Sequence, residues 1–205
     1  LASKYLTEEV DPMCDALGPD NKMIMATGPL TGTMASTGGR YSVICKSPLT
    51  GAIACSNSGG FFGAELKFAG WDMIIFEGKS DKPVYLLIQD DKAELRPGDG
   101  IWGKSAWETD DILHQTHQDP QLRVACVGRT AEHGCLYSAV MNDKHRAAGR
   151  SGVGTVMASK NLKAVAVRGT GGIGNVNDAE AFMAATNDGK AVLAENADTG
   201  QGLPA

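Results

Sequence analysis

The residues best suited to bind a ligand lie in two loops of small residues, each followed by a helical pattern. Residues 55–60 read CSNSGG, and Arg40 follows a glycine pair nearby in STGGRYS. Residues 145–154 read HRAAGRSGVG and place Arg146 and Arg150 among alanine, serine and glycine. Small residues let backbone N–H groups at a helix start approach an anion, and arginine adds a fork of donors that fits phosphate. The two loops predict a ligand with two phosphates, or two phosphorylated ligands.

Each of these features also has a structural interpretation. An arginine near a helix start is commonly solvated or ion-paired, and Asn57 could simply cap a helix beginning near Gly60. The string GRSGVG matches neither GxGxxG nor GxxxxGK[ST], so no nucleotide follows from it. What favours a binding site is the repetition of an arginine beside paired glycines in both loops.

An internal similarity links the two loops. Residues 63–78 read GAELKFAGWDMIIFEG and residues 154–169 read GTVMASKNLKAVAVRG. Both segments begin with glycine, continue with helical turns and a break, and end with apolar strand residues, one charge and a glycine. This pattern indicates a duplicated loop–helix–strand unit, with chance similarity as the alternative.

The elements that would position these loops are short strands and helices. Ser105 and Glu108 predict a capping box for a helix that runs to about Gln118, and Asn177 and Glu180 predict another. Gly70 predicts the end of the helix that follows the first loop. Apolar runs bounded by turn residues predict strands at 22–27, 41–45, 52–55, 72–78, 83–90, 122–128, 135–141 and 163–169, with a weaker strand at AELRP.

Composition narrows the class of protein. The chain has 205 residues, 42% hydrophobic and 21% charged, as expected of one large globular domain or a domain with the start of another. A net charge of -5 argues against general nucleic-acid binding. No apolar run is long enough for a membrane span, and the first residues do not resemble a signal peptide. The five cysteines are far apart, with no CxxC, so we expect mostly buried thiols of a cytosolic protein and no metal cluster from this segment.

Two long strings carry a family resemblance. GPLTGTMASTGGRYSVICKSPLTGAIACSNSGGFFGAELKFAGWDMIIFEGK and MNDKHRAAGRSGVGTVMASKNLKAVAVRG resemble the N-terminal domain of the tungsten-containing aldehyde:ferredoxin oxidoreductase family. The resemblance implies an α+β fold of two pseudosymmetric β-sheet halves with short helices. It places a bis-pterin-binding domain, incomplete at its start, at residues 1–170. Residues 171–205 would be a linker and the first helix leading to cluster-bearing domains, so the chain resembles a fragment truncated at both ends.

The resemblance also implies roles for particular residues in holding a tungstopterin, with tungsten or molybdenum, and a magnesium ion that bridges the two pterin phosphates. No residue of this chain is implied to be catalytic. Two departures are Lys144 and Ser151, which stand where glycines are expected, and His133 in the unusual turn RTAEHG is interpreted as a solvated loop residue. The implied cofactor contacts are Arg40, Asn57 with its side-chain oxygen on magnesium, Gly59 at the pterin, Ala147 with its backbone carbonyl on magnesium, and Arg146, Gly149 and Arg150 around the second pterin tail.

For the whole enzyme, the resemblance implies oxidation of an aldehyde to a carboxylic acid. Electrons would pass through an iron–sulfur (4Fe-4S) cluster, whose ligands lie outside this chain, to ferredoxin. A cytoplasmic, anaerobic setting is implied, and a homodimer is allowed. The alternatives are another substrate in the same family, such as an aromatic thioester to be reduced, a stand-alone pterin- or phosphate-binding module without catalysis, and loops that are only structural turns.

Overall fold

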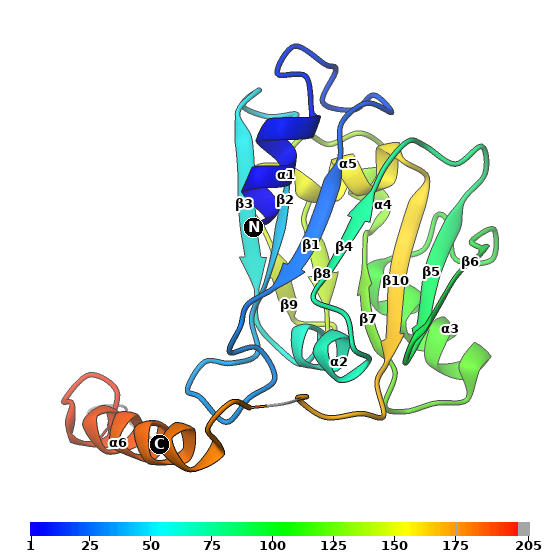
Figure 1. Ribbon diagram of the computed structural model, residues 1–205. Coiled ribbons are helices and arrows are strands. Elements are labelled where there is room, and N and C mark those ends of the chain that lie inside the picture. The colour runs from blue at the N-terminus through cyan, green and yellow to red at the C-terminus, as the bar shows by residue number, and fades with distance from the viewer. Residues whose placement is uncertain (175, 201–205) are drawn as a thin grey trace.

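Two β-sheets form the body of the protein in a computed structural model that describes residues 1–174 and 176–200 (Figure 1). The first sheet has the order β3-β2-β1-β4 and the second the order β6-β5-β10-β7-β8-β9. Every paired neighbour is antiparallel except β5 with β10. The strands are β1 (Met23–Thr27), β2 (Tyr41–Lys46), β3 (Ile53–Ser58), β4 (Met73–Phe76), β5 (Val84–Gln89), β6 (Lys92–Pro97), β7 (Arg123–Cys126), β8 (Val140–Asn142), β9 (Arg146–Ala148) and β10 (Leu162–Arg168).

The two sheets share a repeated unit. In the first, three antiparallel strands β1-β2-β3 are followed by α2 (Phe62–Phe68) and by β4, which returns beside β1. In the second, β7-β8-β9 are followed by α5 (Val153–Ser159) and by β10, which returns beside β7. The predicted duplication and the predicted α+β fold of two pseudosymmetric halves are therefore confirmed. The β5–β6 hairpin and α3 (Ala106–His117) lie between the two units in sequence, and the hairpin widens the second sheet.

The main core lies between the two sheets, because successive side chains of a strand point to opposite faces and one face of each sheet is apolar. On β1, Met23 and Met25 point into this core, whereas Ile24 belongs to a second cluster under α1 (Ala2–Glu9). The Tyr41 and Phe62 rings meet in the core with centroids 4.8 Å apart. Full burial of a side chain such as Phe62 contributes about 2–3 kcal/mol. The outer face of the second sheet is covered by α3.

Of the two capping boxes that the sequence predicts, one is present in the structure and one is not. The capping box of α3 is present: Ser105 Oγ accepts from the Glu108 N–H at 3.2 Å, and the Ser105 N–H donates to Glu108 Oε2 at 2.8 Å. Gly70 follows α2 with a φ of 90°, as a helix-ending glycine does. The predicted box at Asn177 is wrong. The helix α6 (Ala179–Glu195) is capped instead by Asp178, whose carboxylate accepts from the Ala181 N–H at 2.9 Å.

The strand predicted at residues 135–141 is also largely wrong, since β8 begins only at Val140. The preceding backbone is held against α5: the Gly154 N–H donates to the Ser138 carbonyl at 2.9 Å. A Cβ at Gly154 would lie 2.3 Å from the Ala139 carbonyl oxygen. This close approach binds residues 138–139 to the helix and keeps them out of the sheet.

The helix α6 lies apart from the two sheets and beside the loop that follows β1 (Figure 1). Phe182 and Val192 of α6 share a small cavity with Leu30 and Ala35 of that loop. Residue 175 of the expected linker and residues 201–205 of the expected tail lie outside the described residues. Among the described residues, no helix is both long enough and apolar enough to cross a membrane.

Candidate functional site

The edge strands β3 and β9 bring the two sheets together. Side chains on β3 alternate, with Cys55 and Asn57 exposed and Ser56 buried. The inward-facing Ser56 Oγ accepts a hydrogen bond from the Arg150 N–H at 3.1 Å, just beyond β9. A second link is the Ser47 hydroxyl, which donates to the Ser151 carbonyl at 2.8 Å. These bonds join the two halves and leave the outer faces of β3 and β9 open.

A cavity of roughly 500 Å³, here called the junction cavity, opens between these two edges. Five of the seven predicted cofactor residues line it, and they come from both halves. Gly59 and Arg146 stand outside the lining, although Arg146 directly precedes Ala147 and a Cβ at Gly59 would lie 3.8 Å from Arg40 Nη1. The lining residues are Arg40, Cys55, Ser56, Asn57, Ala147, Gly149 and Arg150.

Arg40 and Asn57 are paired within the junction cavity. Arg40 precedes β2, and Asn57 faces Ser42 across the β2–β3 register. The guanidinium donates to Asn57 Oδ1 from Nε at 3.0 Å and also from Nη2. The alternative in which Asn57 caps a helix is wrong, because α2 follows Phe61 and receives no side-chain hydrogen bond from its N-cap.

The expected anion site at the helix N-termini is occupied by a side chain at α2 and is one donor short at α5. The N–H groups of Phe61 and Phe62 at the start of α2 donate to Asp143 Oδ2 at 2.7 and 3.4 Å. At the start of α5, the Gly154 N–H is bonded to a carbonyl. The sequence prediction is therefore wrong for the start of α2, where Asp143 occupies the first donors. At α5 the bond to the Ser138 carbonyl occupies one donor, the Gly154 N–H. At the start of α2, the groups left to meet an anion are therefore arginine side chains and loop backbone.

The arginines of the two loops provide that charge. Among residues 1–174 and 176–200, the ion pairs include Arg96, Arg129 and Arg168, but Arg40, Arg146 and Arg150 pair with no carboxylate. All three are exposed. Three uncompensated guanidinium groups around one junction are a donor set that fits phosphate groups.

Two residues that line the same cavity carry neutral oxygens of the kind a hard cation takes, Asn57 in its side-chain amide and Ala147 in its backbone carbonyl. In the described part of the chain, no three His, Cys, Asp or Glu side chains form a metal-binding group. Magnesium keeps several water and phosphate ligands and needs few from protein, so a pair of neutral oxygens beside phosphate-binding arginines fits it. The residues present therefore fit a phosphorylated ligand with magnesium.

The two departures from the expected glycines keep the glycine-like backbone. Lys144 has a φ of 59° and Ser151 a φ of 63°, both in the left-handed region where glycine is favoured. The second loop thus has the shape that glycines would allow, at a cost in local strain. His133 is exposed, as predicted.

The prediction that most cysteines are buried is wrong for this chain. Cys45 and Cys126 are buried, and burial raises the pKa of each thiol to about 12. Cys14 and Cys135 are partly exposed, and Cys55 is exposed within the junction cavity. The exposure of Cys55 follows from the alternation of buried and exposed side chains along β3.

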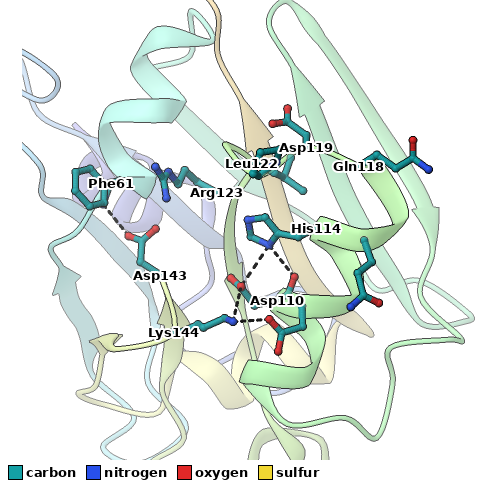
Figure 2. Close-up of a pocket in the computed structure, with 12 residues that line it drawn as sticks. Phe61, Asp110, His114, Gln118, Asp119, Leu122, Arg123, Asp143 and Lys144 are labelled. Carbon is teal, nitrogen blue, oxygen red and sulfur yellow. Dashed lines mark hydrogen bonds and ion pairs between the residues drawn. The ribbon is translucent and has the colours of Figure 1, made fainter.

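Sequence reasoning also missed a second cavity, of roughly 620 Å³, between α3 and the β8–β9 hairpin (Figure 2). Asp110 lies on its wall, and burial raises the pKa of that carboxyl. The Arg123 guanidinium lies over the Phe61 ring, 4.9 Å from its centroid. In the described residues, Arg123 Nε and Asp143 Oδ1 are buried without a hydrogen-bond partner. The cavity therefore lies beside the start of α2 and next to the loop that carries Gly59 and Gly60.

Comparison with known proteins identifies the family. The model of the aldehyde ferredoxin oxidoreductase N-terminal domain matches residues 1–169. The chain belongs to this family. It is 52% identical over 200 residues to the tungsten-containing aldehyde ferredoxin oxidoreductase of Pyrococcus abyssi, covering 98% of this chain and 33% of that protein. It is 49% identical over 204 residues to the Pyrococcus furiosus enzyme of the same name, covering 100% of this chain and 34% of that protein.

A solved structure has the same fold. The active-site complex BamBC of benzoyl coenzyme A reductase, in complex with 1,5-dienoyl-CoA, superposes with a TM-score of 0.92 and 37% sequence identity. The match covers 96% of this aldehyde ferredoxin oxidoreductase family chain and 30% of that chain. The chain therefore spans about a third of the length of the relatives it matches.

Proposed function

We propose that this chain forms the cofactor-holding part of a tungsten bis-pterin oxidoreductase. The complete enzyme would oxidise an aldehyde and water to a carboxylic acid, releasing two protons and passing two electrons through an iron–sulfur cluster to ferredoxin. The observation that carries the proposal is the junction cavity, where residues of two pseudosymmetric halves meet. The relatives named as tungsten-containing aldehyde enzymes support the metal and the substrate class.

In this proposal the chain's own residues bind and orient the cofactor. Arg40 from the first half, and Arg146 and Arg150 from the second, hold the pterin phosphates. Gly59 and Gly149 leave room for close approach of the backbone. When bound, the tungsten centre supplies the redox chemistry, and the protein contributes placement and electrostatics.

The magnesium assignment couples two of these residues. Asn57 Oδ1 has two lone pairs, and Arg40 donates to this atom from two nitrogens. Coordination of magnesium by this oxygen requires Arg40 to release at least one of these bonds. The released guanidinium is then free to bind phosphate, so metal and phosphate binding should favour each other. The Ala147 carbonyl would supply the matching ligand from the second half.

The proposal is tested by cofactor content in the complete protein. Asn57→Ala should lower both tungsten and pterin per subunit relative to wild type. Asn187→Ala removes an exposed amide on α6, far from β3 and β9, and should leave both unchanged. Wild-type loading in Asn57→Ala would contradict the magnesium assignment.

A second candidate is reduction of an aromatic thioester, favoured by the TM-score of 0.92 to the benzoyl coenzyme A reductase complex. The 52% identity to an aldehyde enzyme, against 37% here, favours aldehyde oxidation. Turnover of the complete enzyme with an aldehyde and oxidised ferredoxin, compared with an aromatic thioester and a reductant, separates the two. Bound pterin without either turnover would indicate a binding module.

A further inference from the structure

Asp143 belongs to the second half but caps a helix of the first. It follows β8 in the turn of the β8–β9 hairpin, and its Oδ2 accepts from the N–H group of Phe61 (Figure 2). The same oxygen accepts from the N–H group of Phe62. These are among the N-terminal N–H groups of α2, which have no partner inside the helix. The negative carboxylate also suits the positive end of the helix. A residue from the other half of the domain thus stabilises the start of α2.

Asn142 makes a second set of bonds to the same loop. Its Oδ1 accepts from the Ser58 hydroxyl at 2.6 Å and from the Tyr41 hydroxyl at 3.2 Å. Its Nδ2 donates to the Gly59 carbonyl at 2.9 Å and to Asp143 Oδ2 at 2.8 Å. The amide is 1% exposed and uses both lone pairs and both N–H groups. Such a saturated buried amide allows the loop only one position.

The fit at Gly60 is equally close. Gly60 has a φ of 90°, and a Cβ there would lie 2.2 Å from Asp143 Oδ2 and 3.0 Å from Asn142 Nδ2. Gly39, which precedes Arg40, is close to the same point, since a Cβ at Gly39 would lie 2.6 Å from the Gly60 carbonyl oxygen. The backbone of residues 58–61 is therefore in direct contact with the Asn142–Asp143 pair on one side and with the Arg40 loop on the other.

The β8–β9 hairpin, which carries Asn142 and Asp143, also carries residues that the second half of the domain contributes to the site. Asn142 is the register partner of Arg146, and Met141 is that of Ala147. One hairpin therefore connects the loop around Gly59 in the first half to Arg146 and Ala147 in the second.

We propose that Asn142 and Asp143 are positioning residues that fix the 58–61 loop against the β8–β9 hairpin and so set the spacing of the two pterin-binding segments. This inference rests on the proposed function. Neither side chain lines the junction cavity, so both act through the backbone they hold.

The structure provides an unusually specific pair of variants at Asp143. Its φ of 46° is left-handed, so Asp143→Gly removes the carboxylate without adding backbone strain. Among the described residues, every hydrogen bond to the Asp143 side chain is accepted by Oδ2, and Oδ1 has no partner. Asp143→Asn can place its amide oxygen where Oδ2 lies, and asparagine also tolerates the left-handed region. The conservative variant should therefore restore what the glycine variant loses.

The matched control is Lys144→Gly, in the same hairpin. Lys144 is also left-handed, with a φ of 59°, but its side chain pairs with Asp110 and Asp111 of α3 and not with the 58–61 loop. Lys144→Gly therefore alters the turn of the hairpin and removes one positive charge, but it removes no hydrogen bond to the first half.

Each variant is made in the complete protein and compared by amide hydrogen exchange and by pterin and tungsten content. In Asp143→Gly, exchange at Phe61 and Phe62 should rise at least about fivefold, the factor expected for loss of one helix cap, and pterin content should fall. Lys144→Gly should match wild type in both. Asp143→Asn, which keeps the acceptor but loses the charge, should lie much closer to wild type than Asp143→Gly in exchange and should restore pterin content. If Asp143→Gly does not fold, Ser58→Ala, which removes the hydroxyl donor to Asn142 and a long contact of the same hydroxyl with the Gly59 carbonyl, should give smaller changes in the same direction.

The outcomes distinguish the positioning role of Asn142 and Asp143 from the proposed cofactor-holding function. If wild type contains pterin and Asp143→Gly contains as much, the positioning role is overturned and the proposed function stays intact. The same holds for Ser58→Ala where that is the variant that folds. A failure of Asp143→Asn to restore pterin content would also overturn the positioning role. A wild-type protein without pterin would contradict the proposed function itself, and the positioning role with it.

Discussion

Arg40 and Asn57, on neighbouring segments of the first sheet, are joined through a single oxygen atom. Arg40 Nε lies 3.0 Å from Asn57 Oδ1, and Nη2 donates to the same atom. The pair is exposed in the junction cavity, and the guanidinium has no carboxylate partner among the described residues. An arginine held by a neutral amide keeps its full positive charge for a ligand.

Replacing Arg40 should therefore weaken cofactor retention. A charge-assisted hydrogen bond contributes about 2 kcal/mol, which corresponds to about thirtyfold in affinity. We expect Arg40→Ala to lose pterin and tungsten during gel filtration that wild type survives. Arg96→Ala removes an arginine that pairs with Glu94 on the surface of β6 and should retain both. Equal retention in the two variants would rule out a phosphate-binding role for Arg40.

Ser151→Gly should stabilise the protein. Ser151 has a φ of 63°, which costs a residue with a Cβ about 1–2 kcal/mol, partly offset by the greater unfolded-state entropy of glycine. The expected net gain is about 0.5–1 kcal/mol. The substitution keeps the hydrogen bond from the Ser47 hydroxyl, because that bond is to the backbone carbonyl of Ser151 and not to its side chain. Thermal unfolding measures the gain.

A serine in a helix provides the comparison. Ser159→Gly, at the end of α5, should lower the free energy of unfolding by about 0.5 kcal/mol, because glycine is a poor helix former. If both substitutions destabilise the protein, backbone strain at Ser151 is not the controlling effect.

Features set by a few neighbouring residues were predictable from sequence. The Ser105–Glu108 box and the glycine after α2 depend on contacts within one helical turn. The duplicated unit was visible because its helix and strand recur with the same spacing. Where two good caps stand side by side, as Asn177 and Asp178 do, local preference cannot choose between them. The charged carboxylate of Asp178 is the one used, and it interacts more favourably with the helix dipole.

Features set by the packing of the two sheets were not predictable. Asp143 and Phe61 are 82 residues apart, and their hydrogen bond exists only once β8 and α2 are in place. The same contact makes the expected anion site at the α2 N-terminus unavailable, although the local sequence suits one. Residue types and spacing in the two loops pointed to Arg40, Arg146 and Arg150, and the family resemblance gave the full set of seven candidates with their roles. Neither their types nor their spacing contained information on which strand edges meet. Five of them lie on one cavity because β3 and β9 are the edges that meet.

Lys163 and Glu132 should behave as an obligatory buried pair. Lys163 Nζ lies 2.5 Å from Glu132 Oε1, and the two side chains are 0% and 4% exposed. Lys163 also donates to the Lys104 carbonyl at 2.8 Å, and Glu132 Oε2 accepts from the Gly103 N–H at 2.9 Å. Removing one partner leaves an uncompensated buried charge, so Lys163→Met or Glu132→Gln should cost about 3–5 kcal/mol.

Urea unfolding of the single variants and of the double variant Lys163→Met with Glu132→Gln measures the coupling. The double variant should be more stable than the sum of the two single losses predicts, because it contains no unpaired charge. Strictly additive losses would show that the charges do not depend on each other.

The capping box of α3 should make stability depend on pH in a defined window. Hydrogen bonds from the Ser105 N–H and hydroxyl, with a smaller contribution from the Arg129 charge, lower the pKa of Glu108 from 4.5 to about 2. Because the pKa of Glu108 is lower in the folded state than in the unfolded state, its charged form stabilises the fold at pH values above the unfolded-state pKa. This contribution is lost as pH falls from 4.5 towards 2.

Wild type should be more stable than Glu108→Gln at pH 7, and the difference should shrink across that window. Ser105→Ala removes one of the bonds and should reduce the pH-dependent part of the difference. A difference that is the same at neutral and acidic pH would mean that the ionisation of Glu108 does not contribute to the stability of α3.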